Sequence, residues 1–159
     1  MSDAPQDDVV DIWTDGGCKP NPGAGGWGAI LCFKAVQKEL SGADLDTTNN
    51  RMELTAAAEA LETLKRPCRV RINTDSEYLK NGITRWHTGW VRKNWRNAAG
   101  DPVKNMDLWK RILDAAKTHD IEWRWVRSHI GIKLNERADE LATAARDTAV
   151  AATQAGRHG

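Results

Sequence analysis

Two aspartates in this sequence follow runs of residues that are typical of β-strands. Asp15 comes directly after the apolar, β-branched run 9–14, and Asp75 comes directly after the alternating run 69–74. Each aspartate follows a threonine and precedes a small residue, which leaves room for a ligand to approach. Sites in open α/β sheets form outside the carboxyl ends of strands, so these two carboxylates are candidates for one site.

The chemistry expected of such a pair is metal binding. Two carboxylates held close together repel each other, and a bound cation relieves that repulsion. Hard oxygen ligands favour Mg²⁺ or Mn²⁺ over zinc. On position alone, the alternative interpretation is that Asp15 and Asp75 only cap turns.

The first part of the chain predicts an antiparallel meander that leads into a helix. Residues 27–33 and 36–40 are two further strand candidates separated by a short connection, and 20–26 is a loop rich in glycine and proline. Residues 50–65 then carry apolar side chains at helical spacing, with polar residues available as caps before them.

The second part of the chain alternates helices with strands. The expected elements are a strand at 69–74, short helices within 76–100 broken at Gly82, Gly89 and a turn at 97–100, a helix within 103–118, a strand at 121–125, and a helix at 135–146. Helical crossovers make the later strands parallel. The predicted fold is therefore α/β, with a mixed five-stranded sheet of three antiparallel and two parallel strands flanked by helices.

Composition sets the class of protein. The chain has 159 residues and a mass of 17.7 kDa, which favours one domain, and its net charge of +1 gives no general argument for a polyanionic partner. The three cysteines lack a C-x-x-C pair, so reduced thiols are expected. No apolar run reaches membrane length, and the acidic first residues do not resemble a secretory signal. We therefore expect a cytoplasmic monomer without a membrane partner.

Five motifs in order along the chain resemble one known family. They are TDGGC at 14–18, TTNNRMEL at 47–54, TDS at 74–76, a histidine at 129 and NERADEL at 135–141. Together they look like ribonuclease H of type 1, the bacterial class, and the TTNNRMEL run is the most specific of them. The resemblance covers residues 9–146. It implies a catalytic domain over 9–146, after a disordered lead at 1–8 and before a flexible alanine-rich tail at 147–159.

The resemblance implies a nuclease that cleaves the RNA strand of an RNA/DNA hybrid with little sequence preference, leaving 5′-phosphate and 3′-hydroxyl ends. The matching metal ligands are Asp15, Glu53, Asp75 and Asp139. In this chemistry two Mg²⁺ ions, with Mn²⁺ as a substitute, lie roughly 4 Å apart beside the phosphate. As isolated residues, Glu53 and Asp139 would instead be surface acids that complement a helix dipole.

His129 lies in the expected loop between the last strand and the last helix. The resemblance makes it a proton shuttle, a role that its near-neutral intrinsic pKa allows. Without the motif, the alternative is an ordinary exposed histidine. Ser128 stands where the family commonly has glycine, which predicts a stiffer loop and affects the rate rather than the type of reaction.

A local cluster of positive charge is the candidate surface for binding nucleic acid. Residues 78–100, called the basic arm below, contain five basic and no acidic side chains, interleaved with tryptophans. This segment resembles the family's basic protrusion, and its candidate contacts are Trp86, Trp90, Arg92 and Lys93. The alternatives are that the tryptophans pack on the core and that the basic run is a solvated face.

Short polar side chains near the carboxylates could distinguish RNA from DNA through the 2′-hydroxyls. By resemblance, Asn21, Asn49 and Asn50 match positions that touch the minor groove, while Thr48 and Asn105 match a pocket for a DNA phosphate. The alternatives are a turn residue at Asn21 and a helix cap at Thr48 or Asn49.

Two further departures from the family lie close to these positions. Asp46 replaces an arginine that many relatives have in the phosphate pocket, which predicts weaker affinity for the hybrid. Glu77 replaces an uncharged residue, and it could repel the strand or add charge on the metal side. Two rival functions also remain: a hybrid-binding module without catalysis, and a different nuclease of the same fold, such as a transposase-like domain.

Overall fold

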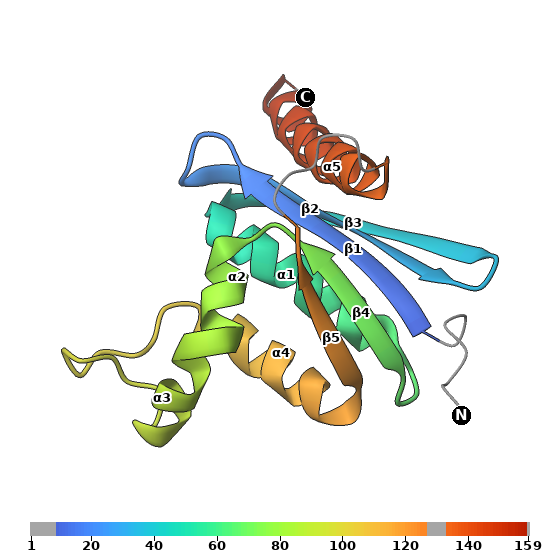
Figure 1. Cartoon of the computed structure of the whole chain (residues 1–159). Helices are drawn as coiled ribbons and strands as arrows, with labels where there is room; N and C mark the ends of the chain where they lie inside the picture. The colour runs from blue at the N-terminus through green and yellow to red at the C-terminus, as the bar shows by residue number, and fades with distance from the viewer. Residues whose placement is uncertain (1–8, 127–132, 159) are drawn as a thin grey trace.

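The structure is a computed structural model, and it describes residues 9–126 and 133–158 (Figure 1). The strands are β1 (Val9–Cys18), β2 (Gly23–Phe33), β3 (Val36–Thr47), β4 (Arg69–Thr74) and β5 (Asp120–Trp125). The helices are α1 (Asn49–Thr63), α2 (Glu77–Asn81), the π-helical turn η2 (Gly82–Trp86), α3 (His87–Arg92), α4 (Met106–Thr118) and α5 (Lys133–His158).

The five strands form one mixed sheet in the order β3-β2-β1-β4-β5. β1 pairs antiparallel with β2, and β2 pairs antiparallel with β3, while β4 is parallel to both β1 and β5. This arrangement confirms the predicted meander of three strands followed by two parallel strands. The thiols of Cys18, Cys32 and Cys68 are all free, as expected.

Helices cover both faces of the sheet (Figure 1). α5 packs on β1, β2 and β3 on one face, and α1 packs on β1 and β2 from the other side, where it also contacts α4. Alternate residues of β1 point to the two faces, so Ile12 is fully buried and points away from the face that carries Asp11 and Asp15. Burying a side chain the size of isoleucine stabilises the fold by roughly 1.5–3 kcal/mol.

The first two strands are longer than the sequence predicts. The prediction ends the first strand before Asp15 and places a loop at 20–26, but β1 continues to Cys18 and β2 begins at Gly23. Their pairing runs from Asp11–Cys32 to Cys18–Gly25, so the glycine-rich segment forms a strand partner rather than a loop. Backbone pairing with a neighbouring strand overrides the low strand propensity of glycine here.

The predicted helix break at Gly82 is wrong, and so is the one at Gly89. Helical backbone continues from α2 through η2 into α3, and Gly89 lies inside α3. Gly82 has right-handed helical angles, and a Cβ at this position would collide with the ring of Trp109. Glycine is therefore present because the fully buried indole of Trp109 approaches the helix backbone, and not because the chain turns there.

The last helix is also longer than expected. The sequence predicts a helix that ends at Arg146, but α5 has 26 residues and reaches His158. Its alanine-rich second half has high intrinsic helix propensity, so no break is required after Arg146. Among the described residues, none of the helices combines the length and the apolar character needed to cross a membrane.

Candidate active site

The parallel pairing of β1 with β4 sets Asp15 beside Asp75. Trp13 is the register partner of Asn73, and each aspartate follows two residues later along its chain. The two carboxylates therefore stand at the same level of the sheet, at the carboxyl end of β4. The expectation that they come together is confirmed, although Asp15 lies within β1 rather than after it.

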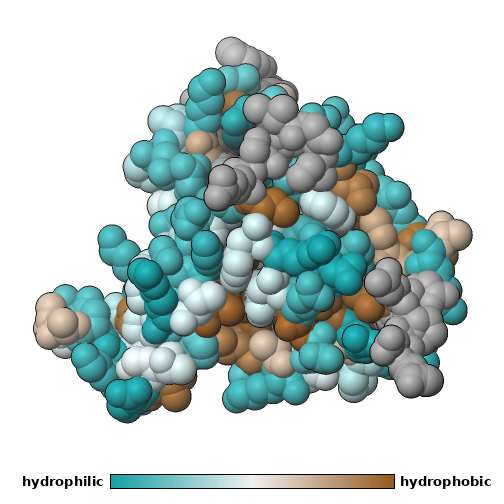
Figure 2. Space-filling view, viewed as in Figure 1, coloured by the Kyte–Doolittle hydropathy of each residue, from teal (hydrophilic) through white to brown (hydrophobic). Residues whose placement is uncertain are grey.

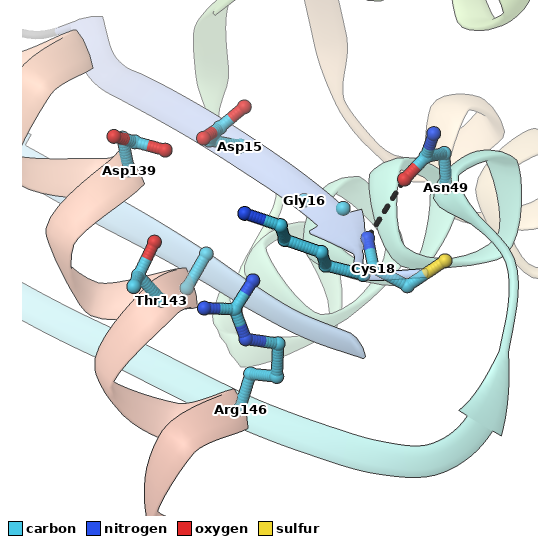
Figure 3. Close-up of a pocket in the computed structure, with 10 residues that line it drawn as sticks. Asp15, Gly16, Cys18, Asn49, Asp139, Thr143 and Arg146 are labelled. Carbon is cyan, nitrogen blue, oxygen red and sulfur yellow. Dashed lines mark hydrogen bonds between the residues drawn. The ribbon is translucent and has the colours of Figure 1, made fainter. Parts of the chain in front are cut away.

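Asp139 reaches the same point from α5. Its carboxyl group and that of Asp15 share a side-chain hydrogen bond. Figure 3 shows the two side chains close to each other, one from the strand and one from the helix. This contact requires a close approach of α5 to β2: a Cβ on Gly28 would lie 2.5 Å from the carbonyl oxygen of Ala138 and 2.7 Å from Cβ of Leu141.

The pKa of Asp15 reflects the other carboxylates that lie close to it. Burial, the hydrogen bond and charge of Asp139, and the charge of Asp75 together raise the pKa of Asp15 to about 8, whereas the N–H of Gly16 lowers it. Without a cation, Asp15 is therefore mainly protonated at neutral pH, in hydrogen-bond contact with Asp139.

Glu53 enters from α1 on the other side of β1. Gly16 lies against the start of that helix, where a Cβ would be 2.5 Å from the carbonyl carbon of Met52 and 2.8 Å from the backbone N of Glu53. Oε2 of Glu53 is buried. The sheet and α5 thus bring Asp15, Asp75 and Asp139 together, and α1 places the backbone of Glu53 against Gly16, the neighbour of Asp15.

The chemistry of these side chains fits a hard divalent cation. All four offer carboxylate oxygens, which suit Mg²⁺ or Mn²⁺, and a cation would relieve the repulsion that raises the pKa of Asp15. Within the described ranges, no three acidic, histidine or cysteine side chains are already arranged as a metal cage. The carboxylates therefore supply the right oxygens, and their rotamers must adjust when a cation binds.

Beside Asp15 and Asp139 lies a cavity of about 200 Å³, whose lining also includes Asn49 (Figure 3). Asn49 Oδ1 accepts the backbone N–H of Cys18 at 2.7 Å, and Asn21 Oδ1 accepts the backbone N–H of Asn49 at 3.2 Å. Asn50 is exposed at the next position. Asn21 and Asn49 are thus together at the end of β1, where their side-chain carbonyl oxygens hold the connection after β1 against the start of α1.

Thr48 and Asn105 are connected through Arg51. The hydroxyl of Thr48 caps α1 by accepting the N–H of Arg51 at 3.1 Å, which is the cap role open from the sequence. The guanidinium of Arg51 donates to Asn105 Oδ1 at 3.0 Å and to both carboxylate oxygens of Asp107. The amide nitrogen of Asn105 donates to the hydroxyl of Tyr78 at 3.1 Å. The two residues therefore share one network, although the Asn105 side chain is already engaged.

The basic arm projects away from the sheet (Figure 1), and hydrophilic side chains cover much of its surface (Figure 2). Trp90 packs against Trp86, Trp95 and the buried Trp109, with ring centroids 5.2 Å apart for the last pair. Trp90 therefore packs on the core, which is one of the two roles that the sequence allowed for it. Trp86 is 38% exposed, and Arg92 and Lys93 are exposed, so these three remain accessible to a ligand.

His129 and Ser128 lie outside the described residues, so their roles stay predictions. Sequence reasoning missed three cavity-lining residues, which are Lys19, Thr143 and Arg146. A signal was available for two of them, because Thr143 and Arg146 follow Asp139 at intervals of four and three residues and so share its helix face.

Comparison with known proteins places this geometry in a family. A sequence model of the family "RNase H" matches residues 7–147. A ribonuclease H of Acidiphilium cryptum is 73% identical over 139 residues, which are 87% of this chain and 87% of that protein. A ribonuclease H of Granulibacter bethesdensis is 70% identical over 141 residues, which are 89% of this chain and 94% of that protein.

Solved structures agree with the sequence relatives. The crystal structure of LC9-RNase H1, a type 1 RNase H with the type 2 active-site motif, superposes with a TM-score of 0.79 at 32% identity, covering 92% of this chain and 75% of that one. LC11-RNase H1 in complex with an RNA/DNA hybrid shares the fold, with a TM-score of 0.66 at 24% identity over 89% of this chain and 99% of that one. The chain belongs to the ribonuclease H family, type 1, whose members are hydrolytic nucleases acting on the RNA strand of RNA/DNA hybrids.

Proposed function

We propose that this chain is a metal-dependent endonuclease that hydrolyses the RNA strand of RNA/DNA hybrids, largely without regard to sequence, and leaves 5′-phosphate and 3′-hydroxyl ends. Residues 9–146 form its catalytic domain, and it acts as a cytoplasmic monomer. The observation that carries the proposal is the meeting of Asp15, Asp75 and Asp139 at the carboxyl end of β4, beside Glu53.

Asp15, Glu53, Asp75 and Asp139 would hold two divalent ions, with Mg²⁺ as the expected metal and Mn²⁺ as a substitute. When bound, such ions activate a water and stabilise the charge on the departing 3′ oxygen. The chain itself fixes the carboxylates on separate elements of the fold, and His129 moves protons for the attacking water or the leaving group.

The hybrid is held on both sides of the carboxylates. Arg92, Lys93 and the exposed edge of Trp86 contact the DNA strand, while Asn21, Asn49 and Asn50 approach the minor groove. Thr48 and Asn105 form the pocket for a DNA phosphate. Trp90 supports the arm mainly by packing on Trp109. Contacts of this kind go to phosphate and sugar and carry little base specificity.

The test is cleavage of an end-labelled RNA/DNA duplex with Mg²⁺, Mn²⁺ or EDTA, run beside RNA/RNA and DNA/DNA duplexes. The proposal expects metal-dependent cutting of RNA only in the hybrid, and end analysis should find 5′-phosphates. Binding without cutting in either metal would identify a non-catalytic module. Cutting of the DNA duplex would instead identify a different nuclease of this fold.

Reversing the charge of Arg92 and Lys93 to glutamate is expected to weaken hybrid binding by about 10-fold or more and to lower its salt dependence. Both side chains are exposed at the end of α3, so folding should be unaffected. Affinity measured across a salt series checks this prediction. If the affinity and the slope remain those of the native chain, the arm does not contact the hybrid.

Asp46→Arg is expected to tighten hybrid binding by several-fold. Asp46 is exposed near the Thr48 cap, and a carboxylate there repels a phosphate that approaches the pocket. The matched control is Asp114→Asn on α4, whose exposed carboxylate pairs with Lys117 and lies far along the chain from the pocket. A Kd for Asp46→Arg equal to that of the control would contradict the prediction.

A further inference from the structure

A stripe of residues on α5 begins in the active site and continues beyond it. Asp139, Thr143, Arg146, Val150 and Gln154 follow one another at intervals of three or four residues, so they lie along one face of the helix. At 1.5 Å per residue the stripe is about 22 Å long. It exists only because α5 continues past Arg146 to His158.

Two hollows lie along this stripe and share two cations. The first is the active-site cavity, which Asp139, Thr143 and Arg146 line from α5. The second has a volume of about 290 Å³ and is lined by Arg146, Val150 and Gln154, among others. Lys19, from the connection between β1 and β2, lines both hollows together with Arg146. The two cations therefore stand where one hollow meets the other.

Arg146 is positioned to exchange its present partner for a phosphate. Its Nε and Nη2 donate to Oδ1 of the neighbouring Asp147 at 3.0 and 2.9 Å. The Asp147 side chain is 64% exposed, and an exposed ion pair of this kind contributes only about 0–1 kcal/mol. Figure 3 shows the Arg146 side chain on the side of α5 that carries Asp139 and Thr143.

The charge pattern indicates which ligand fits. Asp15 and Asp139 line the cavity with carboxyl groups, and the charge of Asp75 acts on Asp15 from nearby, so without a cation this part of the site disfavours a polyanion. Lys19 and Arg146 provide positive charge in the lining of the same cavity. Arginine can bind phosphate oxygens through two parallel N–H donors, and lysine binds them as a point charge. Because these cations line the cavity of the carboxylates, the phosphates nearest to them belong to the strand that is cut.

We propose that Lys19 and Arg146 bind a phosphate of the RNA strand adjacent to the bond that is hydrolysed, and that the α5 surface as far as Gln154 carries the continuation of that strand. This contact lies on the opposite side of the carboxylates from the contacts that the basic arm makes with DNA. It depends on the proposed function, because it requires the RNA strand to be the one that enters the cavity.

The first test removes the two charges. Lys19→Gln/Arg146→Gln is made in the Asp15→Asn background so that binding is measured without cleavage. Neutralising one phosphate contact should lower the slope of log K against log salt by about 1, and we expect the affinity for the hybrid to fall about 5- to 10-fold. The matched control is Lys117→Gln. Lys117 is exposed and lies on α4, a helix on the other side of the sheet from α5. An unchanged slope in the double variant would overturn the proposal.

The second test is a gain of affinity, which misfolding cannot imitate. Asp147→Asn removes the carboxylate that competes with phosphate for Arg146, so hybrid binding should tighten by about 2- to 5-fold. In the Arg146→Gln background the same change should have a smaller effect, because the competition is gone. An equal gain in both backgrounds would show that Asp147 acts by general repulsion and would count against the assigned role of Arg146.

The third test assigns the strand. Hybrids that carry one neutral methylphosphonate at each successive position of the RNA or the DNA strand are bound to the Asp15→Asn chain with and without the double substitution. One RNA position beside the cut should matter only when Lys19 and Arg146 are intact. Sensitivity confined to the DNA strand would refute the assignment. If the native chain does not cleave the hybrid at all, the proposed function itself fails. If it cleaves but the double variant binds normally, only this inference fails.

Discussion

Asp15→Asn is expected to lower the rate of hybrid cleavage by about 10³-fold or more while the protein remains folded and able to bind the hybrid. Asp15 is the carboxylate that faces both Asp139 and Asp75, so its loss removes the central oxygen ligand. Asparagine has nearly the same shape but no charge. Single-turnover cleavage with Mg²⁺ and with Mn²⁺ measures the effect. Native turnover by this variant would refute the proposed mechanism.

The same substitution should stabilise the metal-free protein. The folded-state pKa of Asp15 is about 8, above its ordinary value of 3.8, so the folded chain binds more protons than the unfolded chain between these pH values. Native stability therefore falls as pH rises from about 4 to about 8, by at most about 1.4 kcal/mol per pH unit for this group. An asparagine side chain avoids this loss, and we expect a gain of at most about 4 kcal/mol at pH 7 that vanishes near pH 4.

Urea unfolding in EDTA at several pH values measures this gain. The control is Asp114→Asn, which removes an exposed carboxylate of α4 and should leave the pH dependence unchanged. Adding Mg²⁺ should reduce the difference between the native chain and Asp15→Asn, because the native site, with one more carboxylate, gains more from the cation. If the free energies of unfolding of the native chain and Asp15→Asn differed by the same amount at every pH, repulsion at Asp15 would not limit stability.

Gly28→Ala is expected to cost about 1–3 kcal/mol of stability and to reduce cleavage by about 100-fold. The added methyl group would lie 2.5 Å from the carbonyl oxygen of Ala138, so α5 must move away from β2. Asp139 follows Ala138 directly and moves with it. Catalytic groups that must hold a cation together tolerate displacements of only about 0.5 Å.

The matched control for this prediction is Gly89→Ala. Gly89 lies in α3, and apart from its chain neighbours and the backbone of its own helix, no atom of the described residues comes within 4 Å of a Cβ added there, so the same chemical change should leave packing intact. Circular dichroism, urea unfolding and cleavage rates are measured for both variants. The explanation through α5 fails if Gly28→Ala destabilises the chain but cleaves at the native rate below its unfolding transition.

The sequence predicts the sheet and the central carboxylates because both depend on local patterns. A Thr-Asp pair follows each of two apolar strand patterns, and parallel pairing of those strands places Asp15 beside Asp75. The extent of the strands is not predictable in this way. Gly25 and Gly26 have poor strand propensity, and their pairing with β1 on one side and β3 on the other makes them part of β2.

Where a side chain has two possible roles, tertiary contacts decide between them. Trp90 lies in a basic segment, which suggests a ligand contact, but it also lies four residues after Trp86, which suggests one packed helix face. Its contact with Trp109 shows that it packs on the core. Lys19 and Arg146 are 127 positions apart in sequence, so only the packing of α5 beside β1 brings them to one cavity. No local pattern in the sequence contains that information.

The packing of α5 on the meander of β1, β2 and β3 also sets an order in time. A ribosome releases the three strands before α5, so the sheet face that α5 covers stays open until that helix has been made. Asp15 is likewise without Asp139 until that helix has emerged. The carboxyl groups of Asp15 and Asp139 therefore cannot meet before α5 has been synthesised, so the proposed catalytic centre is incomplete until then.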